Sequence, residues 1–185
     1  MRALTLTALL SLAAPGSLLA ANAWQIDHDE SRLGFEATQQ GGTFTGEFGQ
    51  FAADMRFSPD DLAASAFDVT IDVTSIDTGS SQRDRELPGA DWFYFEQFPQ
   101  ATYRTTRIRA GTDGYEAVGD LTLRDNTREV VLTFTWDTEG ERAQMVGEAV
   151  IDRTHFGIGQ RDWTDPDAVG HEVRVQVDLE LTRGE

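Results

Sequence analysis

The stretch EVRVQVDLEL, residues 172–181, decides the fold. Apolar and polar side chains alternate along it without exception, with valine or leucine at every second position. Successive side chains of a β-strand point to opposite faces of a sheet, so this stretch can place one face on an apolar core and the other in water. The segment therefore predicts a half-buried strand of an antiparallel sheet.

The same alternation runs through most of the chain, and FDVTIDVT at 67–74 repeats it. Turn signals rich in glycine, aspartate and asparagine separate the apolar runs. Further strands are predicted at 24–29, 33–38, 43–57, 101–110, 115–123, 127–136 and 144–151. Short consecutive strands joined by tight turns are typical of an all-β barrel or sandwich. We expect an antiparallel, lipocalin-like β-barrel of about eight strands.

Two segments interrupt the strand pattern. At 58–63, Ser58 is placed to cap one helical turn with Pro59 in its first position. The longer interruption is predicted to be a short helical excursion around residues 80–98, and Pro88 prevents its continuation as a long helix.

The second interruption contains four consecutive aromatic residues at 92–95. Leaving three or four large aromatic side chains in water forgoes on the order of 6 kcal/mol of burial free energy. We therefore expect these rings to face the barrel interior, a ligand or a partner.

The N-terminus reads as a secretory leader. Met1 and Arg2 precede an apolar stretch that ends in the small-residue pattern Ala21-Asn22-Ala23. This pattern predicts a signal peptide at 1–23, cleaved before Trp24, and a single domain at 24–185 in the periplasm. No second apolar run approaches membrane-spanning length, so stable membrane insertion is not expected.

Composition excludes several classes of function. The formal net charge is −17, which disfavours nucleic acid and anionic lipid surfaces as partners. The chain has no cysteine, so disulfides, thiol catalysis and thiolate metal sites are ruled out. The hydrophobic core alone must stabilise the domain.

No motif in the sequence indicates catalysis or a metal site. The three histidines, His28, His155 and His171, lie in separate segments without ligand spacing. The sequence has no nucleophile elbow, P-loop or dinucleotide-binding fingerprint. We predict no catalytic residues, no metal and no required cofactor.

The barrel interior is predicted to be apolar. A barrel of about eight strands encloses either packed side chains or one small ligand, and periodicity does not distinguish the two. Gly46, Gly119 and Gly147 leave space between larger groups. The inward-facing residues are Phe35, Phe44, Phe48, Phe67, Val69, Ile71, Tyr103, Leu121, Leu123, Leu132, Phe134, Trp136 and Met145.

The chain resembles the YceI-like polyisoprenoid-binding proteins, which are exported bacterial lipocalin-like barrels. The resemblance covers essentially the whole mature chain, through five separated segments in the family's order. They are WQIDHDESRLGFEA at 24–37, TFTGEFGQF at 43–51, SIDTGSSQRDRELPGADWFYFEQFP at 75–99, GDLTLRDNTREVVL at 119–132 and IDRTHFGI at 151–158.

The chain also departs from the family pattern. Glu86 stands where the family usually has histidine, Gly89 where it has serine, Asp125 where it has glycine, and His171 where it has an acidic residue. The usual Phe-Phe-Asp-x is replaced by four aromatic residues at 92–95. Trp92, Tyr94 and Phe95 enlarge the aromatic surface where the resemblance implies the pocket entrance.

The resemblance implies that an isoprenoid lipid, such as ubiquinone or a polyprenyl chain, occupies an apolar cavity. The expected apolar contacts are Phe35, Phe44, Phe48, Val69, Ile71, Trp92, Phe93, Phe95, Phe98, Tyr103, Leu121, Phe134, Trp136, Met145, Phe156 and Ile158. Arg83, Asp84, Arg85 and Arg153 are the candidates for head-group contacts. For Arg153, a structural role in binding loop carbonyls is the leading interpretation.

The sequence therefore favours a periplasmic, non-catalytic protein, monomeric or homodimeric, that holds an isoprenoid lipid for transport, storage or protection. Two alternatives stay open. One is an enzyme acting on a lipid-like or small apolar substrate, which requires a polar reactive group facing the cavity. The other is an envelope stress or interaction protein that docks through its aromatic patch.

Overall fold

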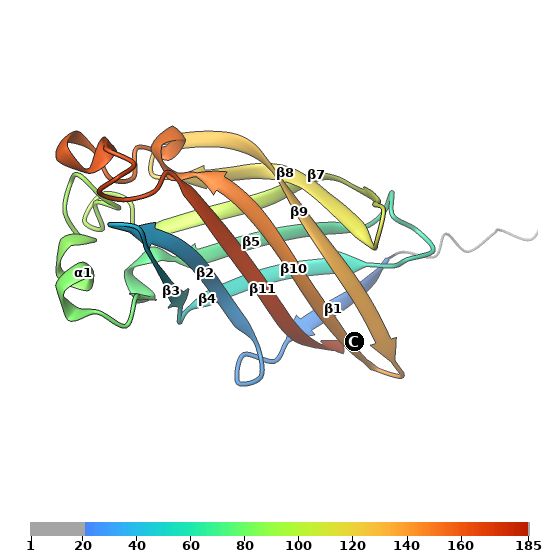
Figure 1. Cartoon of the computed structure of the whole chain (residues 1–185). Coiled ribbons are helices and arrows are strands. Elements are labelled where there is room, and N and C mark those ends of the chain that lie inside the picture. The colour runs from blue at the N-terminus through green and yellow to red at the C-terminus, as the bar shows by residue number, and fades with distance from the viewer. Residues whose placement is uncertain (1–20, 185) are drawn as a thin grey trace, which may run out of the picture.

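A computed structural model describes residues 21–184 (Figure 1). The predicted leader at 1–23 lies outside the described residues except for its last three positions. Of these, Asn22 and Ala23 belong to the first strand, where they pair with Phe57 and Arg56. Among the described residues, no helix has both the length and the apolar composition needed to cross a membrane.

Within residues 21–184 the chain forms eleven strands, one α-helix and three short 3-10 helices. The strands are β1 (Asn22–Ile26), β2 (Arg32–Gln39), β3 (Gly42–Phe48), β4 (Phe51–Phe57), β5 (Ala66–Asp72), β6 (Ile76–Asp77), β7 (Gln100–Ala110), β8 (Tyr115–Leu123), β9 (Asn126–Glu139), β10 (Arg142–Asp152) and β11 (Glu172–Arg183). The helices are η1 (Val73–Ser75), α1 (Ser81–Glu86), η2 (Arg153–Phe156) and η3 (Arg161–Thr164).

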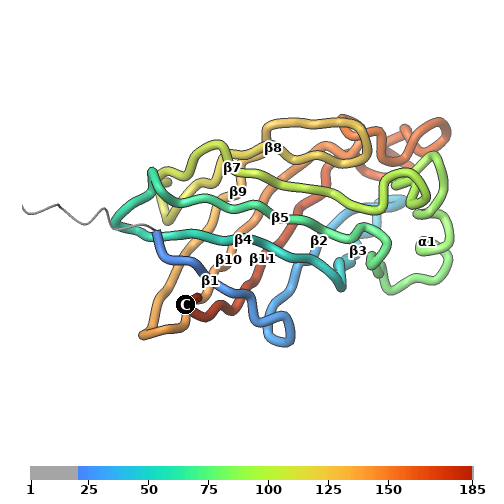
Figure 2. The backbone as a smooth tube through the Cα atoms, turned by 180° about the vertical axis from the view of Figure 1, so that it is seen from behind, coloured from blue at the N-terminus to red at the C-terminus, as the bar shows by residue number. Residues whose placement is uncertain are grey.

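Eight of the described strands close into an antiparallel ring. The order is β1, β4, β5, β7, β8, β9, β10, β11, and β1 closes the ring by pairing with both β4 and β11. Figure 2 shows β1, β4 and β5 side by side on the face opposite to that of Figure 1. The predicted all-β barrel of about eight strands is confirmed.

The three remaining strands extend the ring at one end. β2 pairs with the first half of β11, β3 pairs with β2, and β6 pairs with β3. β1 pairs with the last residues of the same β11. β1 and β2 therefore lie end to end along one neighbour, so these short strands lengthen the barrel wall on the side of α1 (Figure 1).

The predicted strand at 43–57 is divided at Gly49 and Gln50 into β3 and β4. The Gly49 N–H donates to the Ser75 carbonyl at 3.2 Å, and the Gln50 N–H donates to the Ser75 hydroxyl at 3.0 Å. Because Ser75 lies in η1, a helical turn replaces the neighbouring strand at this point. The prediction of one continuous strand overlooked a change of phase, since the inward residues are even-numbered up to Phe48 and odd-numbered from Phe51.

The helical turn predicted at 58–63 is wrong. The segment forms turns without a helix. The Ser58 hydroxyl does accept a bond from the Asp60 N–H at 3.3 Å, as a cap would. However, the Ser65 side chain accepts from the Ser58 N–H and donates to the Asp61 carbonyl. These bonds to Ser65 hold the segment as a compact loop in place of a helical ladder.

The excursion predicted around 80–98 is present. It begins with α1, which ends before Pro88, and continues through turns that cross one end of the barrel (Figure 1). Tyr94 has a left-handed φ of 53°, and its carbonyl accepts bonds from Gln97 and Phe98. This conformation is uncommon for a bulky residue and makes the aromatic run reverse direction.

The opposite end of the barrel is filled by rings that we call the aromatic plug, consisting of Trp24, Phe57, Tyr115, Phe134 and Trp136. Phe57 is fully buried and lies at the centre of the plug. Its ring centroid is 4.6 Å from that of Trp136, 5.0 Å from that of Tyr115 and 5.4 Å from that of Phe134. The Trp24 indole N–H donates to the Phe57 carbonyl at 3.0 Å, which fixes the ring at the seam between β1 and β4.

Gly147 permits the close packing of this plug. A Cβ atom at this position would lie 2.7 Å from the Thr133 carbonyl oxygen and 2.8 Å from the Phe134 Cβ. Both distances are shorter than any normal contact, so a side chain here would displace β9. The space that glycine leaves inside the barrel is therefore taken by its cross-strand neighbour Phe134.

Arg153 holds together the loops at the α1 end. Its side chain is 3% exposed and donates five hydrogen bonds, of 2.5 to 3.0 Å, all to backbone carbonyls. The acceptors are Ile158, Gly159, Trp163, Val169 and Gly170. A buried guanidinium that satisfies this many carbonyls takes over the role that strand pairing has elsewhere.

Replacing Arg153 with methionine is expected to lower the free energy of unfolding by at least about 3 kcal/mol, because buried carbonyls would lose their donor. Urea denaturation followed by circular dichroism measures this change. The control is Arg128→Met, because Arg128 is exposed and bonds only the neighbouring Thr127 carbonyl. That change should stay within about 0.5 kcal/mol. Equal losses in the two variants would contradict a special role for Arg153.

Candidate functional site

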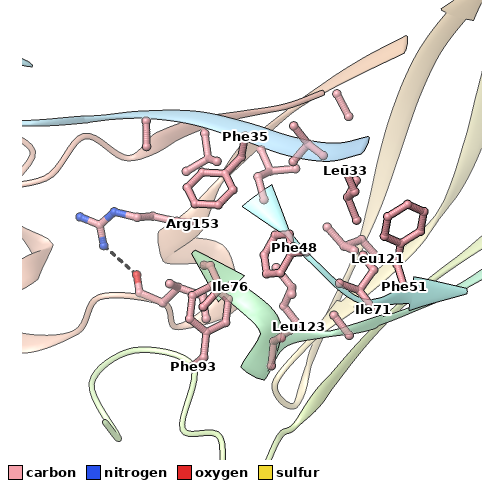
Figure 3. Close-up of a pocket in the computed structure, with 18 of the residues that line it drawn as sticks. Leu33, Phe35, Phe48, Phe51, Ile71, Ile76, Phe93, Leu121, Leu123 and Arg153 are labelled. Atoms are coloured by element: carbon pink, nitrogen blue, oxygen red, sulfur yellow. Dashed lines mark hydrogen bonds between the residues drawn. The ribbon is translucent and has the colours of Figure 1, made fainter. Parts of the chain in front are cut away.

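The half of the barrel nearest α1 contains a cavity of about 430 Å³. Most of its lining consists of aliphatic and aromatic side chains, and Figure 3 shows Leu33, Phe35, Phe48, Leu121 and Phe93 around it. The volume lies within the range of roughly 300 to 1,000 Å³ that is typical of small-molecule sites.

On every strand of the ring the lining stops before the end of the barrel that holds the aromatic plug. We call the last lining residue of each strand, on the side of the aromatic plug, the cavity floor. The floor residues are Ile26, Met55, Phe67, Tyr103, Leu121, Leu132, Met145 and Leu179. Phe67 also touches the plug, since its ring centroid is 5.6 Å from that of Phe134. The cavity is therefore blind at this end.

Eleven of the sixteen predicted apolar contacts line the cavity. They come from six strands, the aromatic run and the loop after η2, and the barrel brings them together from distant parts of the sequence. They are Phe35, Phe44, Phe48, Val69, Ile71, Trp92, Phe93, Tyr103, Leu121, Met145 and Ile158.

Five predicted contacts do not line the cavity. Phe134 and Trp136 face inward as expected, but they lie below the floor, in the aromatic plug. Phe95 packs against Phe93, with ring centroids 6.2 Å apart, and Phe98 packs against Tyr94 at 6.1 Å. Phe156, the last residue of η2, is 2% exposed and belongs to the hydrophobic core. These five residues pack against other side chains of the protein. Their inward or aromatic character correctly predicted packing, but it did not predict contact with the cavity.

Several lining residues were missing from the predicted site. Val173, Val175 and Val177 alternate on β11 and were recognised as inward-facing, but nothing in the sequence showed that they lie above the floor. Trp163 lies in η3, where no periodicity exists to reveal it. Its ring centroid is 5.4 Å from that of Trp92, so two tryptophans from distant segments roof the cavity together.

Polar side chains gather on the α1 side of the cavity, at a rim that we call the mouth. The mouth consists of Gln39, Gln40, Ser80, Gln82, Arg83 and Glu86. Gln39 ends β2 and Gln40 follows it, and the others lie in or next to α1. A ligand with an apolar chain and a polar head would therefore meet most of the hydrogen-bonding side chains at this side.

Arg83 joins the two sides of the mouth. Its guanidinium lies 4.1 Å from the centre of the Phe44 ring and donates to the Gln39 side chain at 3.4 Å and the Thr78 carbonyl at 2.8 Å. No carboxylate lies within ion-pair distance of Arg83 among the described residues. Arg83 thus retains hydrogen-bonding capacity toward the cavity.

The other head-group candidates are differently placed. Asp84 accepts bonds from the N–H and hydroxyl of Thr78 at 3.1 and 2.6 Å, so it fixes the start of α1 and does not line the cavity. Arg85 also does not line the cavity. Arg153 does line it, but its donors are directed to the five carbonyls described above, in agreement with the structural interpretation. Burial lowers the pKa of Arg153, although a guanidinium stays charged near neutral pH.

Among the described residues that line the cavity, the titratable side chains are Arg83, Glu86, Tyr103 and Arg153. Burial raises the pKa of the Tyr103 hydroxyl well above its usual value. This hydroxyl donates to the Ala117 carbonyl at 2.7 Å, so it is bound to the barrel wall. Within residues 21–184, Glu86 is the one carboxylate among the lining side chains, so no pair of carboxyl groups lines the cavity there.

Arg124 holds the aromatic run over the cavity. Nothing in the sequence indicated this role, and Arg124 was not among the predicted site residues. A single guanidinium nitrogen of Arg124 contacts the carbonyls of Ala90, Trp92 and Gly157 at 3.1, 2.8 and 2.6 Å. These carbonyls belong to the aromatic segment and to the loop after η2. Arg124, in the turn between β8 and β9, therefore holds both the aromatic run and the loop after η2 in place. No spacing pattern in the sequence would reveal this contact.

Comparison with known proteins places the chain in a family. The chain is 29% identical to a UPF0312 protein of Pectobacterium atrosepticum, over 97% of this chain and 96% of that protein. The crystal structure of Burkholderia cenocepacia BcnA superposes with a TM-score of 0.79 and 29% identity, covering 84% of this chain and 98% of that one.

A polyisoprenoid binding domain from Saccharophagus degradans, implicated in plant cell wall breakdown, has the same fold, with a TM-score of 0.66 and 15% identity. It covers 88% of this chain and 99% of its own length. The family model described as YceI-like domain matches residues 24–181, and this protein therefore belongs to the YceI-like family.

Proposed function

We propose that this protein binds an isoprenoid lipid, through a quinone tail or a polyprenyl chain, in the barrel cavity and without catalysis. The observation that carries the proposal is the shape of the cavity. It is blind and mostly apolar toward the aromatic plug, where the Tyr103 hydroxyl is bound to a backbone carbonyl, and its polar side chains gather at the mouth. A cavity of this kind matches a molecule with a long apolar body and a small polar end.

Burial of apolar surface is sufficient to bind such a chain. An isoprenoid chain has almost no hydrogen-bonding groups, so side chains such as Val69, Leu132 and Leu179 need only exclude water from it. Each buried CH₂ group contributes about 0.8 kcal/mol. The structural relative from Saccharophagus degradans is described as a polyisoprenoid binding domain, which supports the same class of ligand here.

The mouth supplies the partners for a head group. Gln39 and Gln82 offer amide donors and acceptors, and Arg83 keeps donors that pair with no carboxylate in the described part of the chain. The Trp92 indole N–H is buried and has no hydrogen-bond partner among the described residues, which adds a further donor at the cavity roof. These groups suit a small head group rich in acceptors.

Transport, storage or protection of the lipid in the periplasm is the proposed role. It combines the predicted leader at 1–23 with a cavity that hides an insoluble chain from water. An enzymatic role has less support, because the cavity residues with ionisable groups are either committed to backbone carbonyls or lie at the rim.

Organic extraction of protein purified from its own host is expected to yield an isoprenoid lipid, identified by mass spectrometry. Delipidated protein should then take up a quinone from detergent. Val175→Trp should abolish uptake, because Val175 lines the cavity on β11. Gln176→Trp is the matched control, since Gln176 is exposed on the same strand. Extracts without lipid, together with no uptake by wild-type protein, would rule out the proposal.

A second prediction concerns the aromatic run at residues 92–95, which covers the cavity. Replacing Trp92 and Phe93 with alanine should reduce lipid retention at least about tenfold, since both rings cover the cavity. Both are only half-buried, so the free energy of unfolding should fall by less than about 3 kcal/mol.

Retention is measured by lipid content after gel filtration, and stability by urea denaturation. Phe98→Ala serves as the control in the same segment, because Phe98 packs on Tyr94 outside the cavity. If the double variant loses stability but keeps its lipid, the aromatic run is ordinary core.

A further inference from the structure

The interior of the barrel is divided into an open half and a solid half. On β4 the inward residues Ala53 and Met55 line the cavity, whereas the next inward residue, Phe57, does not. On β9 the same change occurs between Leu132 and Phe134. The boundary is therefore a property of the barrel as a whole, and not of one side chain.

The solid half is closed by ring contacts that leave no passage. Phe57 lies at its centre, and its centroid is 4.6 Å from that of Trp136, which in turn is 5.2 Å from that of Trp24. Tyr115 and Phe134 close the other side, with their centroids 5.4 Å apart. The indole N–H groups of Trp24 and Trp136 donate to the Phe57 carbonyl and the Thr138 hydroxyl, so both large rings are fixed in orientation.

We propose that the aromatic plug acts as a ruler that sets the maximum length of isoprenoid chain the barrel can enclose. The inference rests on the proposed function and adds a determinant of specificity to it. A chain that enters at the mouth advances until its end meets Met55, Phe67 and Met145 at the floor. Any further units of a longer chain remain at the mouth, in contact with water.

The depth of the cavity makes this limit short. On β11 the lining runs from Val173 to Leu179, which corresponds to about 20 Å along the strand at roughly 3.3 Å per residue. Strands of a closed barrel tilt by about 35 to 45°, so the depth along the barrel axis is roughly 15 Å. A chain of a few isoprene units fills this depth, whereas the tail of a long-chain quinone exceeds it.

The test compares prenols of increasing length that share one hydroxyl head group: geraniol, farnesol, geranylgeraniol and solanesol. Quenching of tryptophan fluorescence in detergent reports binding, since Trp92 and Trp163 line the cavity. For wild-type protein, the dissociation constant should fall at least about tenfold with each added unit that is buried. For prenols longer than the chain that the cavity can enclose, the dissociation constant should change by less than about threefold with each added unit.

Two substitutions should move this limit in opposite directions. Ala53→Phe adds a ring one inward position above the floor, so the affinity should stop rising at a shorter prenol than in wild-type protein. Ala52→Phe places the same ring on the exposed face of β4 and should leave the limit unchanged. Phe57→Ala removes the centre of the plug and should extend the limit to a longer prenol.

Circular dichroism decides whether Phe57→Ala is folded, and Ala53→Phe still tests the proposal if it is not. An affinity that rises with every added unit in wild-type protein would overturn the ruler. A limit that stays in place in Ala53→Phe would also overturn it. Absence of binding by every prenol would overturn the proposed function together with this inference, whereas binding without a length limit would overturn the inference alone.

Discussion

Closure of eight strands into one ring sets the width of the interior, and the rest of the molecule follows from how that width is filled. A ring of this size is just wide enough for large side chains to meet at its axis, or for one small ligand to lie there. This barrel does both. At one end Phe57 and its aromatic neighbours reach across and touch. At the other end the walls carry shorter residues such as Ala53 and Val175, and a cavity remains.

The α1 end of the barrel shows how irregular loops become a fixed roof. Loop carbonyls there have few strands to pair with, and a buried carbonyl without a donor is costly. Arg153 and Arg124 supply the missing donors, because their guanidinium groups hydrogen-bond to backbone carbonyls of segments that are far apart in the sequence. The aromatic run is thereby held above the cavity, with Trp92 against Trp163. An element that binds ligand is thus supported by residues that do not need to touch the ligand at all.

The strands were largely predictable, and the boundary of the cavity was not. Alternation at 172–181 correctly identified every inward residue of β11, because the side-chain period of a strand depends only on the backbone. The same alternation correctly predicted that Phe134 and Trp136 face inward, yet both rings lie in the aromatic plug and do not line the cavity. Periodicity reports which face a residue occupies. It contains no information about the height of that residue along the barrel axis, which depends on tilt and on register with the neighbouring strands.

By itself, the sequence determined the all-β class, the alternation of faces, the apolar interior and the helical excursion that ends at Pro88, because these depend on local backbone geometry and residue type. Only the tertiary structure decided where the open half of the barrel stops, which rings close it, and that Arg153 serves backbone carbonyls instead of a ligand. These features require distances between segments far apart in the chain. Such distances are set when the strands come into register and the ring closes, and no single segment encodes them.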